Sequence, residues 1–323
     1  MAEDLIRQDE NLADLISASP LQELHSKRLD RAGIRLLVKR DDLIHPLFGG
    51  NKWRKLKYNL IEAQTRQHKT LLTFGGAWSN HIYATAAAGK YFGFNTIGLI
   101  RGERQSALNR TLAFARECGM QLHYLDRSQY RKKDEPSFIE EIGQKFGKVY
   151  LLPEGGSNSL AIEGCKEIVR EIDETIDRPF DYICCASGTG ATLAGLGLGI
   201  WENHSSDKQS AIGFSALKGG VFLESEAKIF MTGDSSINTQ AVTADHIQVE
   251  TNYHFGGYAK ITDELVRFMS AFEYQFGFKL DAVYTAKMFF GLFDMIHEGR
   301  FDPGTTIVAL HSGGLQGNSG FDL

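Results

Sequence analysis

The sequence lacks the features that direct a chain to a membrane or a secretory route. Among its 323 residues, no apolar run approaches the roughly 20 residues that cross a bilayer. Its first residues, MAEDLIRQDENLADL, are charged throughout and contain no apolar core of a signal peptide. We therefore expect a cytoplasmic protein with no membrane partner.

Cysteine is scarce and scattered. The four cysteines form no CxxC pair and the ten histidines form no HExxH pattern, so the sequence predicts no metal site. Cys184 and Cys185 are neighbours in an expected strand, and their side chains should point to opposite faces of the sheet. We expect all four to be reduced thiols: Cys118, Cys165, Cys184 and Cys185.

Positive charge is not in excess either. The chain has 35 Lys and Arg against 40 Asp and Glu, a formal net charge of −5, which argues against nucleic acid as the main partner. Hydrophobic residues make up 42% of the chain and charged residues 23%. These proportions are typical of a globular protein, and the length suffices for one large domain or two ordinary ones.

Short apolar runs alternate with helical patterns along the chain. The alternation predicts an α/β fold with open parallel sheets covered by helices on both faces. A boundary between two α/β units is expected near the PEGG stretch, residues 153–156. The expected strands are 70–74, 96–100, 121–125, 149–152, 181–186, 211–217 and 305–310, and the expected helices are 81–91, 107–118, 192–201 and 262–276.

The motif GGNKWRKL occupies residues 49–56. Its two glycines permit a close backbone approach, and Lys52 follows at the start of an expected helix. A lysine fixed at such a junction can form an imine with an aldehyde cofactor. The alternative is a solvated surface lysine, and this is what we expect of the neighbouring Arg54, Lys55 and Lys57.

A second motif, GGAWSNH at residues 75–81, follows an expected strand and opens a helix. Backbone N–H groups at such a helix start can hold an anion, with hydrogen bonds added by Ser79 and Asn80. The alternative is that Ser79 or Asn80 only caps the helix.

Two further glycine-rich segments follow expected strands. SGTGAT at residues 187–192 offers two hydroxyls, Thr189 and Thr192, and fits a monophosphate, because the Walker and dinucleotide patterns are absent. LHSGG at residues 310–314 follows the last strand, and Ser312 there could meet a ring nitrogen or satisfy a turn. Ligands bind beyond the carboxyl ends of parallel strands, so these loops should converge.

Together, the four motifs in this order resemble the tryptophan synthase β-like fold of pyridoxal phosphate (PLP) enzymes. Within it, the chain resembles the 1-aminocyclopropane-1-carboxylate (ACC) deaminase and D-cysteine desulfhydrase family. The blocks SPLQEL at 19–24, KRDDL at 39–43 and LHSGGLQG at 310–317 extend the resemblance over nearly the whole chain. It implies PLP as cofactor and an active site in the cleft between two open-sheet domains. The implied domains are a large PLP-binding domain of residues 1–53 and 164–323 and a smaller α/β domain of residues 54–163, with a possible homodimer.

The family also implies a role for each matched position. Lys52 resembles the lysine that bonds PLP as a Schiff base and later moves the substrate α proton. Asn80 resembles the residue bonded to the ring hydroxyl, and Thr285 and Ser312 correspond to positions near the ring nitrogen. The implied catalytic residues are Lys52, Ser79, Tyr258 and Tyr284; the substrate carboxylate site is Ser79, Asn80 and His81; the phosphate loop is Gly188, Thr189, Gly190, Ala191 and Thr192.

Three departures from the family pattern bear on the reaction. ACC deaminases are expected to carry Glu where this chain has Thr285, and a carboxylate beside the pyridine nitrogen makes PLP a stronger electron sink. Trp78 replaces the usual Gln and Tyr83 the usual Arg, both expected near the substrate. The sequence therefore favours a PLP-dependent lyase that acts on a small amino acid by α,β-elimination, as a D-cysteine desulfhydrase does, giving a keto acid and ammonia. The alternatives are an ACC deaminase and a PLP-binding protein without turnover.

Overall fold

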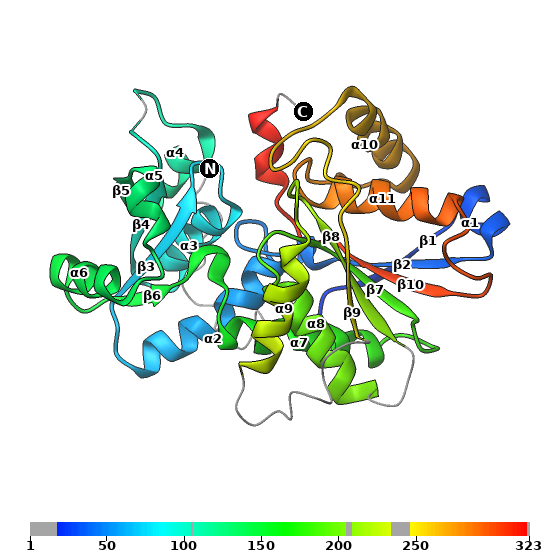
Figure 1. The fold of residues 1–323 in the computed structure, drawn as a ribbon, viewed down its shortest axis with the longest axis horizontal. Helices are drawn as coiled ribbons and strands as arrows, with labels where there is room; N and C mark the ends of the chain where they lie inside the picture. The colour runs from blue at the N-terminus through cyan, green and yellow to red at the C-terminus, as the bar shows by residue number, and fades with distance from the viewer. Residues whose placement is uncertain (1–17, 105, 205–208, 234–245, 322–323) are drawn as a thin grey trace.

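The computed structural model describes residues 18–104, 106–204, 209–233 and 246–321, which form two sheets (Figure 1). The larger sheet has the order β1-β2-β10-β7-β8-β9 and the smaller the order β5-β4-β3-β6. β1 pairs with β2 antiparallel, and the other strand pairs of these two sheets are parallel. The strands are β1 (Leu21–Leu24), β2 (Arg35–Lys39), β3 (Thr70–Gly76), β4 (Asn95–Arg101), β5 (Gln121–Leu125), β6 (Tyr150–Leu152), β7 (Tyr182–Ser187), β8 (Ser210–Ser215), β9 (Ile247–Glu250) and β10 (Thr306–Leu310).

Helices cover both sheets. They are α1 (Lys27–Ala32), α2 (Asn51–Thr65), α3 (Asn80–Tyr91), α4 (Arg110–Glu117), α5 (Arg127–Arg131), α6 (Pro136–Phe146), α7 (Ser159–Asp173), α8 (Ala191–His204), α9 (Phe222–Thr232), α10 (Asp263–Phe276) and α11 (Thr285–His297). The described residues also form the short 3₁₀ turns η2 (Asp41–Leu43), η3 (Glu154–Gly156) and η4 (Leu315–Gly320).

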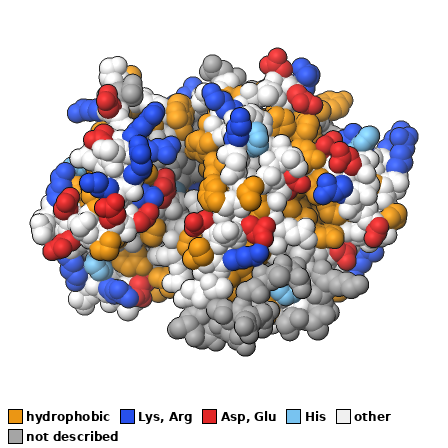
Figure 2. Space-filling model, in the orientation of Figure 1, with side chains coloured by type: hydrophobic (Ala, Val, Ile, Leu, Met, Phe, Trp, Pro, Cys, Tyr) orange, Lys and Arg blue, Asp and Glu red, His pale blue; other side chains and the backbone are white. Residues whose placement is uncertain are grey.

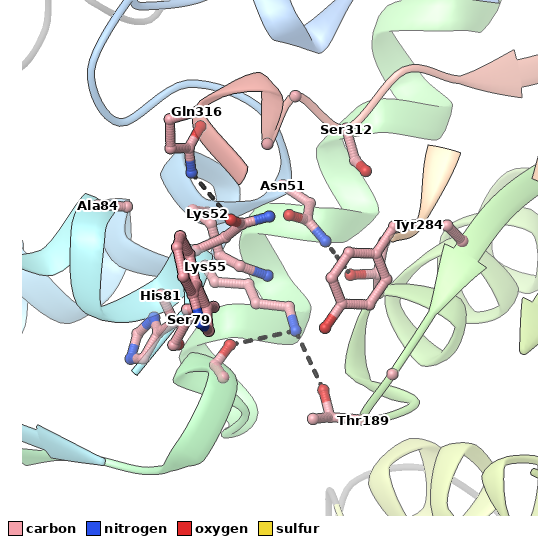
Figure 3. A pocket seen from close by; sticks show the side chains of 18 of the residues that line it. Asn51, Lys52, Lys55, Ser79, His81, Ala84, Thr189, Tyr284, Ser312 and Gln316 are labelled. Carbon is pink, nitrogen blue, oxygen red and sulfur yellow. Dashed lines mark hydrogen bonds between the residues drawn. The ribbon is translucent and has the colours of Figure 1, made fainter. Parts of the chain in front are cut away.

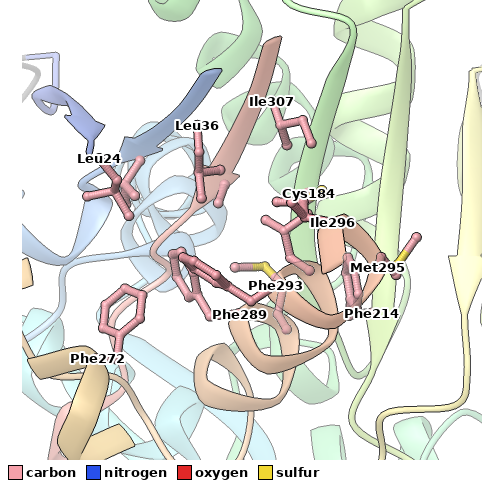
Figure 4. Close-up of a cluster of buried hydrophobic side chains, with 14 of the residues drawn as sticks. Leu24, Leu36, Cys184, Phe214, Phe272, Phe289, Phe293, Met295, Ile296 and Ile307 are labelled. Carbon is pink, nitrogen blue, oxygen red and sulfur yellow. The ribbon is translucent and has the colours of Figure 1, made fainter. Parts of the chain in front are cut away.

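The large sheet is buried on both faces by different helices. Phe272 of α10 and Phe289 of α11 pack on one face (Figure 4), whereas residues of α7, α8 and α9 pack on the other. Cys184 belongs to the first cluster and Cys185 to the second, as the alternation of a strand requires. Such two-sided burial is the reason that β7 and β10 consist of continuous apolar runs.

The small sheet is covered in the same way. Ile82 of α3 packs with Ile100 on one face, and Tyr130 of α5 packs with Leu99 on the other. In Figure 1 this lobe lies at the left, beside the large sheet and its helices. The α/β fold with two open sheets is therefore confirmed.

The strands and helices predicted from the sequence all occur, with ends shifted by a few residues. The sequence reading did not find β1, β2, β9, α1, α5, α6, α9 or α11. The strands of the small sheet all lie within residues 54–163, and those of the large sheet lie outside this range. The predicted limits at 53/54 and 163/164 fall inside α2 and α7, two helices that pack against each other.

Within the described ranges, no helix has the length and apolar character that crossing a membrane requires. These residues also contain no group of three or more His, Cys, Asp and Glu side chains arranged to hold a metal ion. Basic and acidic side chains are interspersed over the face shown in Figure 2.

The basic side chains beside Lys52 are buried, so the prediction of a solvated face for Arg54, Lys55 and Lys57 is wrong. They are 4%, 2% and 3% exposed, respectively. A buried cation needs a compensating anion, and Lys57 meets Glu167 of α7. Helical periodicity could not show these acids, because they lie more than 100 residues away in the chain.

Arg54 joins three separate segments. Its guanidinium contacts Asp41 of η2 through Nε at 3.0 Å and Nη2 at 2.9 Å, and Glu171 of α7 through Nη2 at 2.8 Å. Glu171 also pairs with Lys39 of β2 at 2.7 Å. Close packing of α7 on α2 requires Gly164, since a Cβ there would lie 1.9 Å from the Arg54 carbonyl oxygen.

Arg54→Met should destabilise the fold by about 3–5 kcal/mol, because it leaves the buried Asp41 carboxylate without its cation and Glu171 with Lys39 alone. Urea unfolding at neutral pH measures this loss. Arg66→Met is the matched control at the end of the same helix: the Arg66 side chain is 64% exposed and pairs with Glu62. Its loss should be below about 1 kcal/mol. Equal losses for the two variants would contradict a structural role for the buried pair.

Candidate active site

A cavity of about 560 Å³ lies between the two lobes, and residues of both line it (Figure 3). Gly76 and Arg101 end strands β3 and β4 of the small sheet, and Ser187 ends β7 of the large sheet. Ser312 follows β10. The predicted convergence at the carboxyl ends of parallel strands is therefore observed.

The glycines of the GGNK motif allow the start of α2 to touch the loop after β10. Gly50 has φ +71°, and a Cβ on it would lie 2.1 Å from the Ser312 carbonyl oxygen. A Cβ on Gly49 would lie 2.4 Å from the His45 oxygen. A side chain at either position would push α2 away from the cavity. The two glycines thus fix the position of the backbone from which the Lys52 side chain extends.

Lys52 points into the cavity from the first turn of α2 (Figure 3). Burial lowers the pKa of its ammonium to about 7, and the nearby charge of Lys55 lowers it further in the same direction. A lysine with this pKa is partly neutral at neutral pH. Its amine is then a nucleophile toward an aldehyde and a base toward a C–H proton.

Lys55 lies at the end of the cavity that is next to the predicted phosphate loop. Its Nζ lies 3.3 Å from the Gly155 carbonyl oxygen, 3.4 Å from Ser157 Oγ and 3.5 Å from Thr189 Oγ1 (Figure 3). Burial lowers the pKa of Lys55, so an anion bound here would stabilise its charged form.

The predicted phosphate loop lies beside Lys55, at the N-terminus of α8. Gly188, Thr189, Gly190 and Thr192 line the cavity, and Asn51 Nδ2 donates to Thr192 Oγ1 at 3.1 Å. The side chain of Ala191 is fully buried, so its backbone N–H is the group that could face an anion. Loop and lysine together form a cationic cradle.

Ser79, Asn80 and His81 line the small-lobe side of the cavity. The Ser79 hydroxyl also accepts a hydrogen bond from Ile82 N at 3.3 Å, so Ser79 caps α3 as well as facing the cavity. Gln316 Nε2 donates to Asn80 Oδ1 at 2.9 Å. Burial holds the pKa of His81 well below its usual value, which keeps the imidazole neutral.

Two tyrosines form the opposite wall. The rings of Tyr258 and Tyr284 are 6.0 Å apart and meet edge to face. Tyr284 packs on Gly188, where a Cβ would lie 3.1 Å from the tyrosine Cε1. Burial raises the pKa of both phenols, so they stay protonated and can donate a proton or a hydrogen bond.

Thr285 is not brought into the cavity with the other predicted residues. Its side chain has no exposed surface, and its hydroxyl accepts from Asp281 N at 2.7 Å. The hydroxyl closes the turn that starts α11, and Thr285 is not among the residues that line the cavity. Ser312, the second residue predicted there, does line the cavity.

Of the two unusual residues near the Ser–Asn pair, Trp78 lines the cavity and Tyr83 does not. The Trp78 ring packs on Gly320 of η4, where a Cβ would lie 2.8 Å from the indole. Tyr83 stacks on Phe114, with ring centroids 4.0 Å apart, and faces a separate pocket. The expectation that Tyr83 sits near the substrate is thus not met.

The sequence reading missed several residues that line the cavity or lie behind it. Lys55 could have been found, since it is three residues from Lys52 and so shares its helix face. Asn51, Glu154 and Gln316 lie inside segments that the sequence analysis singled out, but no role was given to them, and Arg101 gave no local signal because only the tertiary fold brings it here.

The comparisons with known proteins agree with this geometry. The model of the family "Pyridoxal-phosphate dependent enzyme" matches residues 12–313. The chain belongs to this family. It is 32% identical over 304 residues to the mitochondrial bifunctional D-cysteine desulfhydrase/1-aminocyclopropane-1-carboxylate deaminase of Arabidopsis thaliana, covering 88% of this chain and 73% of that protein. A D-cysteine desulfhydrase of Salmonella schwarzengrund is 27% identical over 314 residues, 93% of each chain. The crystal structure of an ACC deaminase homologue superimposes with a TM-score of 0.80 at 29% identity, covering 94% of this chain and 91% of that one.

The protein is therefore a PLP-dependent enzyme, and its cavity fits that cofactor. The donor set is complementary: a partly neutral lysine for the aldehyde, and a cradle of hydroxyls, N–H groups and Lys55 for the phosphate.

Asp281 is a buried carboxyl close behind the cavity wall. Its Oδ1 accepts from Tyr284 N at 2.6 Å, while its Oδ2 has no partner among the described residues. A Cβ on Gly314 would lie 3.4 Å from Oδ2 and 2.6 Å from Asn80 Nδ2. Burial raises the pKa of Asp281 to about 7.

The raised pKa of Asp281 makes a pH-dependent prediction. The native state keeps a proton that the unfolded chain, with an Asp pKa of about 4, has lost. The stabilisation from this group is thus present below about pH 4 and is lost as the pH rises toward 7. Asp281→Asn carries no charge, so its free energy of unfolding relative to the wild type should rise across this window.

Urea unfolding at pH 5, 6, 7 and 8 tests this difference. The control is Asp177→Asn, because a hydrogen bond from Arg35 lowers the pKa of this exposed carboxyl. Its difference from the wild type should be flat over the same range. A flat profile for Asp281→Asn as well would show that the native carboxylate ionises normally.

Proposed function

We propose that the protein catalyses α,β-elimination from a small amino acid, as a D-cysteine desulfhydrase does, releasing a keto acid and ammonia. The observation that most supports this reaction is that the carboxylates of Asp42 and Glu154, which line the cavity, already have partners within the protein. Asp42 is held by Arg40 at 2.9 and 2.8 Å, and Glu154 accepts from the Tyr130 hydroxyl at 2.8 Å. Neither acid is free to pair with a pyridine nitrogen, and the buried carboxyl of Asp281 is not part of the cavity lining.

At the ring-nitrogen end we assign the hydroxyl of Ser312, without a carboxylate beside it. PLP, when bound, withdraws electrons from the substrate α carbon, and it does so less strongly when its nitrogen is unprotonated. Cysteine has a good leaving group at its β carbon, so a moderate sink suffices. The ring of ACC has no α hydrogen to remove and requires the stronger sink.

Different groups of the protein act in the successive steps of the elimination. The backbone N–H groups at the start of α3, with Ser79, bind the substrate carboxylate. Lys52 Nζ, once free of the cofactor, accepts the α proton. The C–S bond then breaks, and the phenol of Tyr258 or Tyr284 donates a proton to the leaving sulfur. Water hydrolyses the released enamine to pyruvate and ammonia.

ACC deamination is the second candidate, since the Arabidopsis relative is named for both activities. A PLP-binding protein without turnover is the third, and membership of a family of PLP-dependent enzymes counts against it. A small amino acid is the substrate class that all enzyme candidates share. A homodimer and a cytoplasmic location stay predictions; the four free, buried cysteines suit a reducing compartment.

The cofactor should be bonded to Lys52. Borohydride treatment of the purified protein, followed by peptide mapping, should place the reduced cofactor on the peptide that contains this residue. Lys52→Ala should lose the covalent link but retain PLP through the cradle around Lys55. Lys133→Ala is the control, because Lys133 lies outside the cavity lining, and it should keep the link. A label on another lysine would overturn the assignment.

Substrate choice tests the proposed reaction itself. The wild-type protein should release pyruvate and sulfide from D-cysteine at least about a hundredfold faster, in kcat/KM, than 2-oxobutyrate from ACC. That ratio corresponds to about 2.7 kcal/mol in transition-state stabilisation. Comparison with L-cysteine shows which enantiomer the enzyme prefers, and comparison with β-chloro-D-alanine shows how the rate depends on the leaving group. Efficient ACC deamination would favour the second candidate, and no keto acid from any amino acid would favour the third.

A further inference from the structure

Lys287 is a buried cation that the proposed chemistry does not use. It lies in the first turn of α11 and is 1% exposed. Its Nζ donates to the carbonyl oxygens of His254 at 2.9 Å and Gly257 at 2.8 Å. Burying an ammonium group is costly unless hydrogen bonds compensate it. Here the compensation comes from the backbone of a single loop.

That loop, residues 251–262, has an unusual backbone. Phe255 and Ala259 have φ values of 51° and 53°, which residues with side chains rarely adopt, and Gly256 and Gly257 have φ values of 93° and 121°. Such conformations persist where surrounding contacts impose them. The two hydrogen bonds from Lys287 hold this segment at His254, directly before Phe255, and at Gly257, in its middle.

The loop supplies one wall of the active-site cavity. Tyr258 follows Gly257 directly, lines the cavity and is 39% exposed. At the start of the loop, the Tyr253 hydroxyl donates to Asp294 of α11 at 2.9 Å. Lys287 is therefore the α11 side chain that bonds the backbone immediately before Tyr258.

We propose that Lys287 is a positioning residue for Tyr258. Its buried ammonium holds the strained loop against α11 and so sets where the Tyr258 phenol meets the substrate, leaving the cofactor cradle unaffected. This inference rests on the proposed function only in the role given to Tyr258. The hold on the loop can be measured without turnover.

The first measurement is backbone deuterium exchange of the PLP-bound protein over residues 252–261. Lys287→Met should raise exchange in this segment at least about tenfold, because two charge-assisted bonds are lost. Lys260→Met removes an exposed lysine of the same loop and is the control, with exchange unchanged. Equal protection in Lys287→Met and the wild type would overturn the proposal.

The second measurement is a double-mutant cycle with Tyr258→Ala, using kcat and KM for the amino acid that gives the best turnover. Lys287→Met should lower kcat/KM about tenfold or more in the wild type, and less than about twofold when Tyr258 is already removed. The PLP dissociation constant should stay within about twofold. Equal losses in both backgrounds would show that Lys287 does not act through Tyr258.

Two further cases have to be distinguished from a failure of this proposal: a variant that does not fold and a protein that turns over no amino acid. If Lys287→Met does not fold, Lys287→Gln keeps an N–H donor group without the charge and should show intermediate exchange; wild-type protection in it would also overturn the proposal. If no amino acid is turned over, the proposed function fails. The exchange measurement still decides whether Lys287 holds the loop.

Discussion

The buried ion pairs of Arg54 fix the helix on which the active site depends. Arg54 and Lys52 are two residues apart in α2 and so face different directions, one toward Asp41 and Glu171 and the other into the cavity. The first turn of α2 is held from outside by these carboxylates and from inside by Gly50 against the Ser312 loop. Because removing the cation would leave buried charge, the helix has little freedom to rotate. The direction of the Lys52 amine follows from this constraint.

The same helix links the cofactor cradle to the sheets. Lys55 lies one turn beyond Lys52 and reaches Thr189 at the start of α8 and Gly155 in η3, the turn after the last strand of the small sheet. Burial lowers the pKa of both lysines, and the charge of Lys55 lowers that of Lys52 further. A dianionic phosphate between Lys55 and the N-terminus of α8 would restore the charge of Lys55 while leaving the Lys52 amine reactive.

Local patterns in the sequence predicted the parts of the site that consist of contiguous residues. GGNK, the Ser79–Asn80 pair and the loop of residues 187–192 each follow a strand or open a helix, and the structure brings them into one cavity. The sequence reading misplaced residues whose surroundings come from distant segments. Arg54, Lys55 and Lys57 were expected in solvent because their acidic or polar partners lie far along the chain. Thr285 is a different case, because its hydroxyl accepts a hydrogen bond from Asp281 N, only four residues away, and the residue does not line the cavity.

The lining of the site is divided between the two lobes. The amine and the phosphate cradle belong mostly to α2 and the large sheet, whereas Ser79, Asn80 and Trp78 project from the small lobe. Contacts across the cleft include Gln316 Nε2 with Asn80 Oδ1 at 2.9 Å and Trp78 on Gly320. Both reach η4, the segment directly after the Ser312 loop. A change in Trp78 would thus alter the substrate pocket through η4 without touching the cradle at Lys55. Because the cofactor's chemistry is common to the family, we infer that selectivity resides in these contacts between the lobes rather than in the residues that hold PLP.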